Sequence, residues 1–291
     1  MKTLIKQGHK LHIQCCGSRW SCRVMAALGL LLGSACAPFG GPAHERLLES
    51  AGWTSSQLEV AGFQLALFSQ ALPVDTELLN IYLGGDGSAF VARQRIGRDP
   101  TGSEHTGLQL AIADPAPSAF LARPCYYGGA FTPPCEPSLW TLERYSPRVV
   151  GAVVEALAEL ARRYPRARLT LVGYSGGGVI ALLAARQLER VERVITVAAP
   201  LDTAAWTQHH GYTNLSAGSN PAQITDWPVR LRQLHLFGDR DTRVPATVVA
   251  SYHAATGLSP AQSVTVPVAD YDHACCWVQD WPAILAALAA R

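Results

Sequence analysis

One stretch, Arg168–Leu188, decides the fold: RLTLVGYSGGGVIALLAARQL. Its first five residues form an apolar run of strand length, and GVIALLAARQL at its end has the composition of a helix. Between them lies GYSGG, residues 173–177, which fits the pattern G-x-S-x-G. Small glycines allow a strand and a helix to pack closely around a sharp turn. The stretch therefore predicts a strand, a tight turn that presents the Ser175 hydroxyl, and a helix.

Strand and helix signals alternate along the rest of the chain. Short apolar runs predict strands at Phe63–Ser69, Leu78–Leu83, Ala119–Ala122, Val194–Ala198, Leu231–Phe237 and Ser263–Val268. Helical spacing predicts helices at Leu108–Ala113, Pro147–Tyr164, Thr247–Thr256 and Trp281–Ala290. This alternation is typical of a doubly wound α/β domain, with a mostly parallel sheet and helices on both faces. The long connection Leu201–Val229 has room for a small flap but not for a large cap domain.

The composition is that of a folded protein with a basic leader. The chain has 291 residues, of which 48% are hydrophobic and 16% charged, so it can bury a large core. Its formal net charge of +2 is too small for a basic nucleic-acid-binding protein. Residues 1–35 contain five Lys or Arg and no Asp or Glu, so the rest of the chain is mildly acidic. This distribution is typical of an exported protein.

The leader contains an apolar segment, Val24–Ala35, that reads VMAALGLLLGSA and is too short to span a bilayer. Basic residues precede it and small residues follow it, which is the order of a secretory signal. Three fates remain open: ordinary cleavage after Ala37, lipidation of Cys36 as in a bacterial lipoprotein, and an uncleaved anchor. The lipoprotein pattern matches imperfectly, because Leu32 lies one position too far from the cysteine.

These signals divide the chain into three parts. We expect a signal or lipoprotein-type leader at 1–36, a tether and N-terminal approach at 37–57, and the α/β domain at 58–291. The expected location is the periplasm, with membrane attachment if Cys36 is lipidated.

Ser175 is the candidate nucleophile, because a strand before G-x-S-x-G and a helix after it form the setting of a catalytic serine. A glycine-rich helix start that only packs is the alternative. A serine hydroxyl needs a histidine to take its proton and a carboxylate to orient that histidine. The expected order along the chain is serine, acid, histidine.

The candidate acid follows the strand predicted at Leu231–Phe237, in GDRDTRVP, residues 238–245. Asp241 lies three residues after the glycine and three before Val244, in a G-x-x-D-x-x-V-P arrangement that we associate with the acid of a triad. Asp239 is the second candidate, although it suits a turn or a helix cap better.

The candidate base is His273, in the segment Asp270-Tyr271-Asp272-His273, because it follows the last predicted strand and can reach back to Ser175. The other histidines of the body suit the core, the surface or the mouth of a pocket. They are His44, His105, His209, His210, His235 and His253.

Two backbone amides are candidate donors to an oxyanion. Gly176 lies at the N-terminus of the predicted helix, where its N–H can donate to a developing oxyanion. Asp86, in the Gly-rich segment Leu83–Ser88 after a predicted strand, is the choice for the second N–H, with an ordinary glycine turn as the alternative. Its carboxylate would oppose a nearby oxyanion, so we expect it to point away and to pair with a cation, with Arg123 and Arg144 as possible partners.

Four cysteines lie in the body of the chain: Cys125, Cys135, Cys275 and Cys276. An even number in an exported protein indicates disulfide bonds, and three pairings are possible. A short loop closed by Cys125 and Cys135 is one solution, and a link from Cys275 or Cys276 to that loop is another. A zinc site with His273 is the rival interpretation, although the spacing fits no familiar zinc pattern.

In their order along the chain these motifs resemble the α/β-hydrolase superfamily, over about residues 58–291. Segments such as Ala122-Arg123-Pro124-Cys125 and His273-Ala274-Cys275-Cys276-Trp277 resemble uncharacterised bacterial exported members. The resemblance implies an eight-stranded sheet, no cofactor and an acyl-enzyme mechanism. By position it implies Ser175 as nucleophile, Asp241 as acid and His273 as base, with Gly176 and Asp86 as oxyanion donors. The sequence departs at Gly84, where many esterases have histidine.

The expectation is therefore a serine hydrolase, most simply a carboxylesterase, that acts on a small-molecule ester and binds no nucleic acid or metal. Two alternatives stay open. One is a serine peptidase or amidase, since the same triad serves both, and the other is a non-catalytic envelope protein that keeps the fold.

Overall fold

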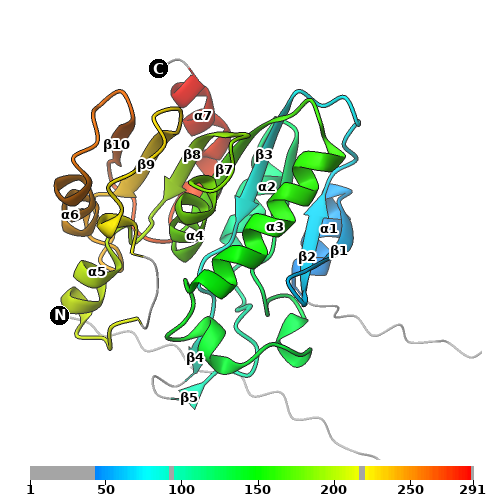
Figure 1. Ribbon diagram of the computed structural model, residues 1–291, viewed down its shortest axis with the longest axis horizontal. Helices are drawn as coiled ribbons and strands as arrows, with labels where there is room; N and C mark the ends of the chain where they lie inside the picture. Colours follow the sequence, from blue (N-terminus) through cyan, green and yellow to red (C-terminus); the bar gives the residue numbers. More distant parts are fainter. Residues whose placement is uncertain (1–42, 92–94, 216–219, 290–291) are drawn as a thin grey trace, which may run out of the picture. The chain divides into compact units, whose positions relative to one another are not determined.

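The strand, turn and helix around Ser175 lie at the centre of an eight-stranded sheet in the computed structural model (Figure 1). The structure describes residues 43–91, 95–215 and 220–289, so the predicted leader lies outside the described residues. The strands follow the order β1-β2-β6-β3-β7-β8-β9-β10, and β2 alone runs antiparallel to both of its neighbours. The other neighbouring pairs are parallel. The predicted doubly wound, mostly parallel sheet is confirmed.

The bounds of the elements agree closely with the hydrophobic patterns. The strands of the main sheet are β1 (Thr54–Val60), β2 (Phe63–Ser69), β3 (Leu78–Leu83), β6 (Ser118–Leu121), β7 (Arg168–Tyr174), β8 (Val191–Val197), β9 (Arg232–Gly238) and β10 (Ser263–Val268). The helices are α1 (Ala43–Ala51), α2 (Thr106–Ala113), α3 (Pro147–Arg163), α4 (Gly176–Ala185), α5 (Thr203–His210), α6 (Ala246–Thr256) and α7 (Trp277–Ala289). A small hairpin, β4 (Phe90–Val91) with β5 (Arg95–Ile96), lies apart from the sheet.

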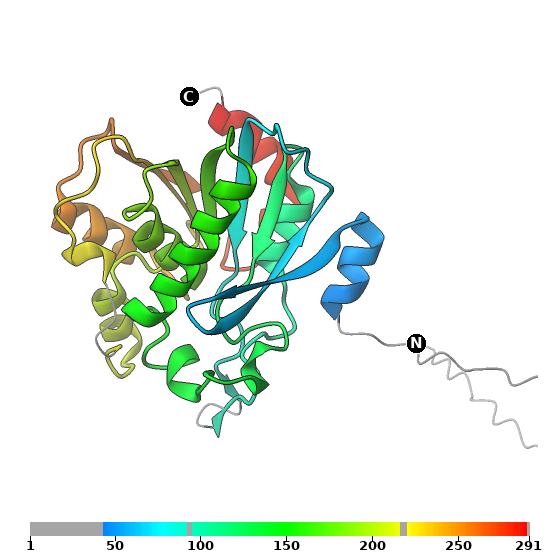
Figure 2. The same cartoon turned by 45° about the vertical axis from the view of Figure 1, so that its right-hand side comes forward.

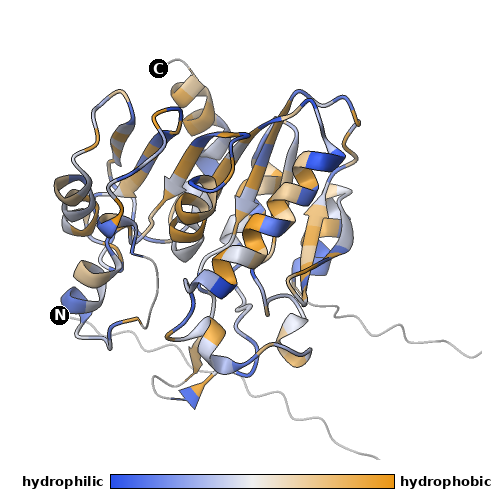
Figure 3. Ribbon diagram, viewed as in Figure 1, coloured by the Kyte–Doolittle hydropathy of each residue, from blue (hydrophilic) through white to orange (hydrophobic). Residues whose placement is uncertain are grey.

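Helices cover both faces of the sheet. In Figure 1, α3 and α4 lie in front of it and contact each other, whereas α2 and α7 form a contacting pair behind it. All ten residues of α4 are buried, and this helix is apolar on every side. Helix α3 instead buries an apolar stripe along one side and exposes its polar side (Figure 3). The start of α3 follows its sequence: the Ser146 side chain accepts a hydrogen bond from the Val149 N–H, and Pro147 occupies the first turn.

The predicted start of the domain at residue 58 is wrong. Residue 58 lies inside β1, which pairs with β2 along its whole length, and α1 contacts β1 (Figure 2). The described residues belong to one compact unit, Gly40–Arg291. Only Leu58 is buried in β1, so this edge strand lacks the apolar run that revealed the other strands.

Two further boundaries differ from the prediction. Helix α7 begins at Trp277 rather than Trp281, and Pro282 lies inside it, although a proline usually marks a first turn. The connection Leu201–Val229 contains α5 and a short 3₁₀ helix, Pro221–Gln223. Among the described residues no segment forms a cap domain, and none of their helices is long and apolar enough to cross a membrane.

Buried hydrogen bonds connect His235 in β9 to Thr196 in the neighbouring strand β8 and to Gln233 in β9. Its Nδ1 lies 2.8 Å from the Thr196 hydroxyl, and its Nε2 lies 3.3 Å from the Gln233 Oε1. An amide oxygen only accepts, so Nε2 carries the proton and Nδ1 accepts from Thr196. Burial, with a smaller contribution from His253, lowers the pKa of His235 to about 3. This histidine is therefore neutral in the folded protein.

We predict that His235→Gln makes the protein less sensitive to acid. The unfolded chain takes up this proton near pH 6.5, whereas the folded protein resists it to about pH 3, so stability falls as the pH drops through that window. The contribution is at most about 1.4 kcal/mol per pH unit. Urea unfolding at pH 7 and pH 5 measures it, with His209→Gln on the exposed face of α5 as the control. Equal acid sensitivity of the two variants would contradict the prediction.

Candidate active site

Ser175 lies in a strained turn between β7 and α4. Its φ of 51° is in the left-handed region, which residues with a side chain rarely adopt. The glycines around it allow the close approach: a Cβ on Gly173 would overlap the backbone of Gly178, and a Cβ on Gly177 would overlap the carbonyl of Leu83. Strain of about 1–3 kcal/mol at such a residue persists only where the surrounding packing imposes it.

Three predicted residues, distant in sequence, meet at the carboxyl edge of the sheet. His273 Nε2 lies 3.1 Å from Ser175 Oγ, and His273 Nδ1 lies 2.8 Å from Asp241 Oδ2. A carboxylate only accepts, so the Asp241 contact places the proton on Nδ1 and leaves Nε2 free to accept from the serine. The two contacts form a continuous hydrogen-bonded chain from a serine through a histidine to a carboxylate.

Of the two candidate acids, the structure places only Asp241 beside the histidine. The Asp241 side chain is completely buried, and its Oδ1 accepts hydrogen bonds from the Arg243 and Val244 amides, both at 2.8 Å. Asp239 instead accepts a hydrogen bond from the Asp270 N–H at 2.7 Å. Its role is that of a turn residue, as its position in the sequence suggested.

The loop that carries His273 is held by contacts that sequence analysis missed. The Tyr174 hydroxyl donates to the His273 carbonyl at 2.7 Å, so the residue before Ser175 helps to position His273. Asp272 Oδ1 accepts from the Ala274 and Cys275 amides, at 2.8 and 2.7 Å. The sequence could have singled out both residues, because Tyr174 is the variable position of G-x-S-x-G and Asp272 directly precedes His273.

The loop after β3 packs against the turn at Ser175. A Cβ on Gly85 would lie 3.2 Å from the Ser175 Cβ, and a Cβ on Gly176 would overlap the Asp86 carboxylate. The segment that carries the second predicted oxyanion donor therefore adjoins the first. We expected the Asp86 carboxylate to point away from the site, but it lies against Gly176.

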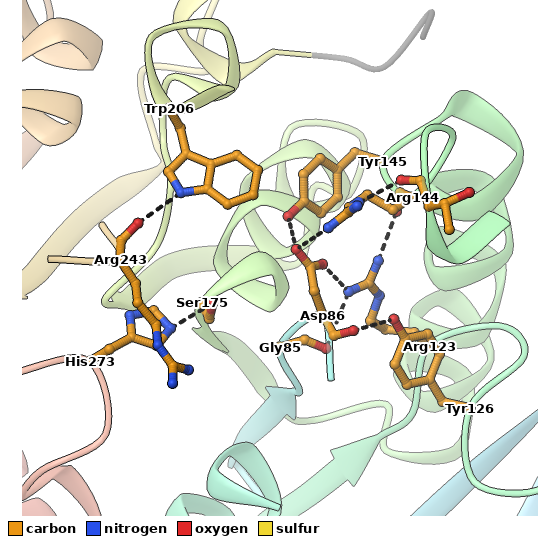
Figure 4. A network of polar contacts seen from close by, with 11 residues as sticks. Gly85, Asp86, Arg123, Tyr126, Arg144, Tyr145, Ser175, Trp206, Arg243 and His273 are labelled. Atoms are coloured by element: carbon orange, nitrogen blue, oxygen red, sulfur yellow. Dashed lines mark hydrogen bonds and ion pairs between the residues drawn. The ribbon is translucent and has the colours of Figure 1, made fainter. Parts of the chain in front are cut away.

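The charge of Asp86 is offset by both candidate cations (Figure 4). Its carboxylate contacts Arg123 Nη1 at 2.5 Å and Arg144 Nη1 at 3.0 Å, and it accepts from the Tyr145 hydroxyl at 2.7 Å. Burial alone would raise the pKa of Asp86, but Arg144 and Arg123 outweigh it and lower that pKa to about 2. The backbone is fixed as well, because Tyr126 donates to the Asp86 carbonyl at 3.0 Å.

A cleft of about 1270 Å³ opens over Ser175 and His273. Its lining combines aromatic and aliphatic side chains with charged ones. The large apolar members are Phe90, Tyr126, Tyr127, Leu142, Trp206, Tyr212 and Leu215, and the arginines are Arg144 and Arg243. Trp206 belongs to α5, the helix that the sequence did not reveal, and its Nε1 donates to the Arg243 carbonyl at 2.8 Å. His209 and His210 lie on α5 but do not line the cleft.

The cysteines form two pairs, Cys125 with Cys135 and Cys275 with Cys276. The alternative link between the His273 loop and the 125–135 loop is therefore wrong. Both sulfurs near His273 are bonded to each other, and the described part of the chain holds no group of three or more His, Cys, Asp or Glu suited to a metal ion. The rival zinc interpretation gains no support.

Solved structures share this fold at low sequence identity. An esterase from Pyrococcus furiosus aligns with a TM-score of 0.60 and 11% identity, over 84% of this chain and 95% of its own. A serine hydrolase homologue from Coxiella burnetii gives 0.54 and 16%, over 81% and 94%. The esterase domain of a Rhodothermus marinus protein gives 0.52 and 18%, over 82% and 96%.

No protein-family model matches the sequence, and no curated protein is significantly similar to it. At these identities the structural likeness concerns the fold alone. The chain has the α/β-hydrolase fold that the motifs implied, with Ser175 in the turn after the central strand β7.

We predict that Asp86→Asn destabilises the protein by about 3–5 kcal/mol, because it leaves two buried guanidinium groups without a carboxylate. Thermal or urea unfolding measures the loss. Asp226→Asn is the matched control, since Asp226 pairs with Arg186 on the exposed surface, and we expect it to change stability little. Equal effects of the two substitutions would contradict a buried ionic cluster.

Proposed function

We propose that the protein is a serine hydrolase that cleaves carboxylic esters through an acyl-enzyme. The observation that carries the proposal is the continuous chain of contacts from Ser175 Oγ through His273 to the buried Asp241. The esterases among the structural neighbours support the ester class.

The proposed reaction begins when Ser175 Oγ attacks the ester carbonyl while His273 Nε2 takes its proton. Asp241 keeps the imidazole in the required tautomer and stabilises its charged form. The backbone amides of Gly176 and Asp86 donate to the developing oxyanion. His273 then protonates the leaving alcohol, and water repeats the sequence to release the acid.

Cleavage of an ester and of an amide needs the same proton transfer from His273 to the leaving group, so the ester class rests on the structural neighbours rather than on these three residues. An amide substrate is the second candidate, because the same three residues can act on it.

We predict that Ser175→Ala and Asp241→Ala each lower the rate of p-nitrophenyl ester hydrolysis by about 10³-fold or more, because each removes a member of one catalytic unit. Asp239→Ala should keep the activity of the unsubstituted protein, since the Asp239 carboxylate accepts from the Asp270 N–H and not from the His273 ring. Assays from short to long acyl chains, with p-nitroanilides in parallel, also separate ester from amide preference. Full activity in Ser175→Ala would exclude the mechanism. Complete inactivity of every form toward both substrate series would favour a binding protein.

We also propose that the protein is exported. The Cys125–Cys135 bond in the folded unit supports this, because disulfides persist in oxidising compartments. Expression of the full chain in a Gram-negative host, followed by mass spectrometry of its N-terminus, tests the proposal. Cleavage after Ala37 would indicate a free periplasmic protein, and a lipid on Cys36 would indicate a lipoprotein. An intact leader on soluble cytoplasmic protein would contradict export.

A further inference from the structure

Two buried guanidinium groups share one carboxylate beside the cleft. The side chain of Arg123 is 1% exposed and that of Arg144 is 10% exposed, and both contact Asp86. Asp86 is the carboxylate that acts most strongly on each of them. The tyrosines in the cluster supply no negative charge, since burial raises the pKa of Tyr126 to about 12 and raises that of Tyr145 well above its usual value. The cluster therefore has an excess of one positive charge.

The two arginines use their donors differently. Arg123 donates through Nη1 to Asp86 and to the Gly85 carbonyl, and through Nη2 to the Arg144 carbonyl. Arg144 donates through Nε to the Thr141 carbonyl and through Nη1 to Asp86, whereas its Nη2 donates to no group among the described residues. The unpaired Nε of Arg123 is buried, whereas the free Nη2 of Arg144 is not, so the Arg144 donor is the one that a ligand in the cleft can reach.

Of these two arginines, Arg144 is the one that lines the cleft containing Ser175 and His273. A second cation, Arg243, lines the same cleft with its backbone fixed by Asp241 and Trp206. The guanidinium of Arg243 is exposed and forms no ion pair within the described chain. Besides Asp86, the carboxylate of the lining is Glu104, which is exposed. The buried pair of Arg144 and Asp86 at the cleft is therefore backed by Arg123, which gives the ionic cluster its one excess positive charge.

We propose that the cleft binds esters that carry a second, anionic group, a carboxylate or a phosphate, and that Arg144 pairs with this group through its free Nη2. This inference rests on the proposed hydrolase function and narrows its substrate class. Either anion suits this nitrogen, because a charged N–H group donates a strong hydrogen bond to a carboxylate or a phosphate oxygen. The competing explanation is that the excess positive charge of the cluster stabilises only the oxyanion and does not contact an anionic group of the substrate.

Matched ester pairs distinguish these explanations. On the acyl side, 4-nitrophenyl monoesters of adipic and suberic acid are compared with 4-nitrophenyl esters of hexanoic and octanoic acid. On the alcohol side, 4-carboxyphenyl hexanoate is compared with 4-carbamoylphenyl hexanoate. The protein variants are Arg144→Gln and, as the control, Arg148→Gln, which removes an exposed arginine that pairs with Glu136 on the surface.

We expect Arg144→Gln to lower kcat/KM for the anionic ester of at least one pair by about tenfold more than for its neutral partner. Arg148→Gln should leave the ratio unchanged. A parallel loss for anionic and neutral esters in every pair would overturn the proposal and assign Arg144 to the oxyanion.

A binding measurement keeps the test independent of catalysis and of the stability of Arg144→Gln. Ser175→Ala is titrated calorimetrically with adipate, with hexyl phosphate and with neutral hexanamide, in the presence and absence of salt. Saturable binding of an anion but not of hexanamide supports the site, and the stronger anion identifies its chemistry. No binding of either anion would overturn the inference. A protein that binds these anions but hydrolyses no ester would contradict the hydrolase proposal and leave the anion site intact.

Discussion

The ion pair between Asp86 and its two arginines is the constraint on which the site depends. Asp86 follows β3, Arg123 follows β6 and Arg144 precedes α3, so one carboxylate joins three connections at the carboxyl edge of the sheet. Neither guanidinium could remain buried without this carboxylate, because the cost of dehydrating an unpaired charge is several kcal/mol. Burial also protects the cluster from screening by salt, to which exposed pairs are sensitive. The loop over Ser175 is therefore fixed by charge as well as by packing.

The strained turn at Ser175 has a different origin. Its positive φ costs free energy, and the burial of all ten residues of α4 against β7 and β8 offsets that cost. Because α4 is apolar on every side, it cannot shift toward solvent to relax the turn. The Leu83 carbonyl also lies where a side chain on Gly177 would be, so sheet, loop and helix meet in a space that only glycine fits. The position of the Ser175 hydroxyl at the cleft is thus a consequence of how the core packs.

The sequence predicts those parts of this structure whose residue pattern lies within a short stretch of chain. The strands with continuous apolar runs were found, as was the Ser175 turn, because their patterns are contained in a few residues. Asp241 and His273 were found from their order after predicted strands. Strand β1 was missed because it buries only Leu58, and α5 was missed because its apolar periodicity is weak. The sequence offered Arg123 and Arg144 as alternative partners of Asp86, but only three-dimensional contacts reveal that both are used.

Different contacts position the two sides of the cleft, the His273 loop and the Asp86 loop. His273 is positioned by hydrogen bonds from the Tyr174 hydroxyl and within its own loop, none of which involves the arginines. The Asp86 loop is positioned by Arg123, Arg144 and two tyrosines, none of which contacts His273. A change in the ionic cluster therefore acts on the Asp86 side of the cleft and leaves the hydrogen bonds of His273 in place. In this fold, substrate preference can change while the arrangement of serine, histidine and aspartate stays the same.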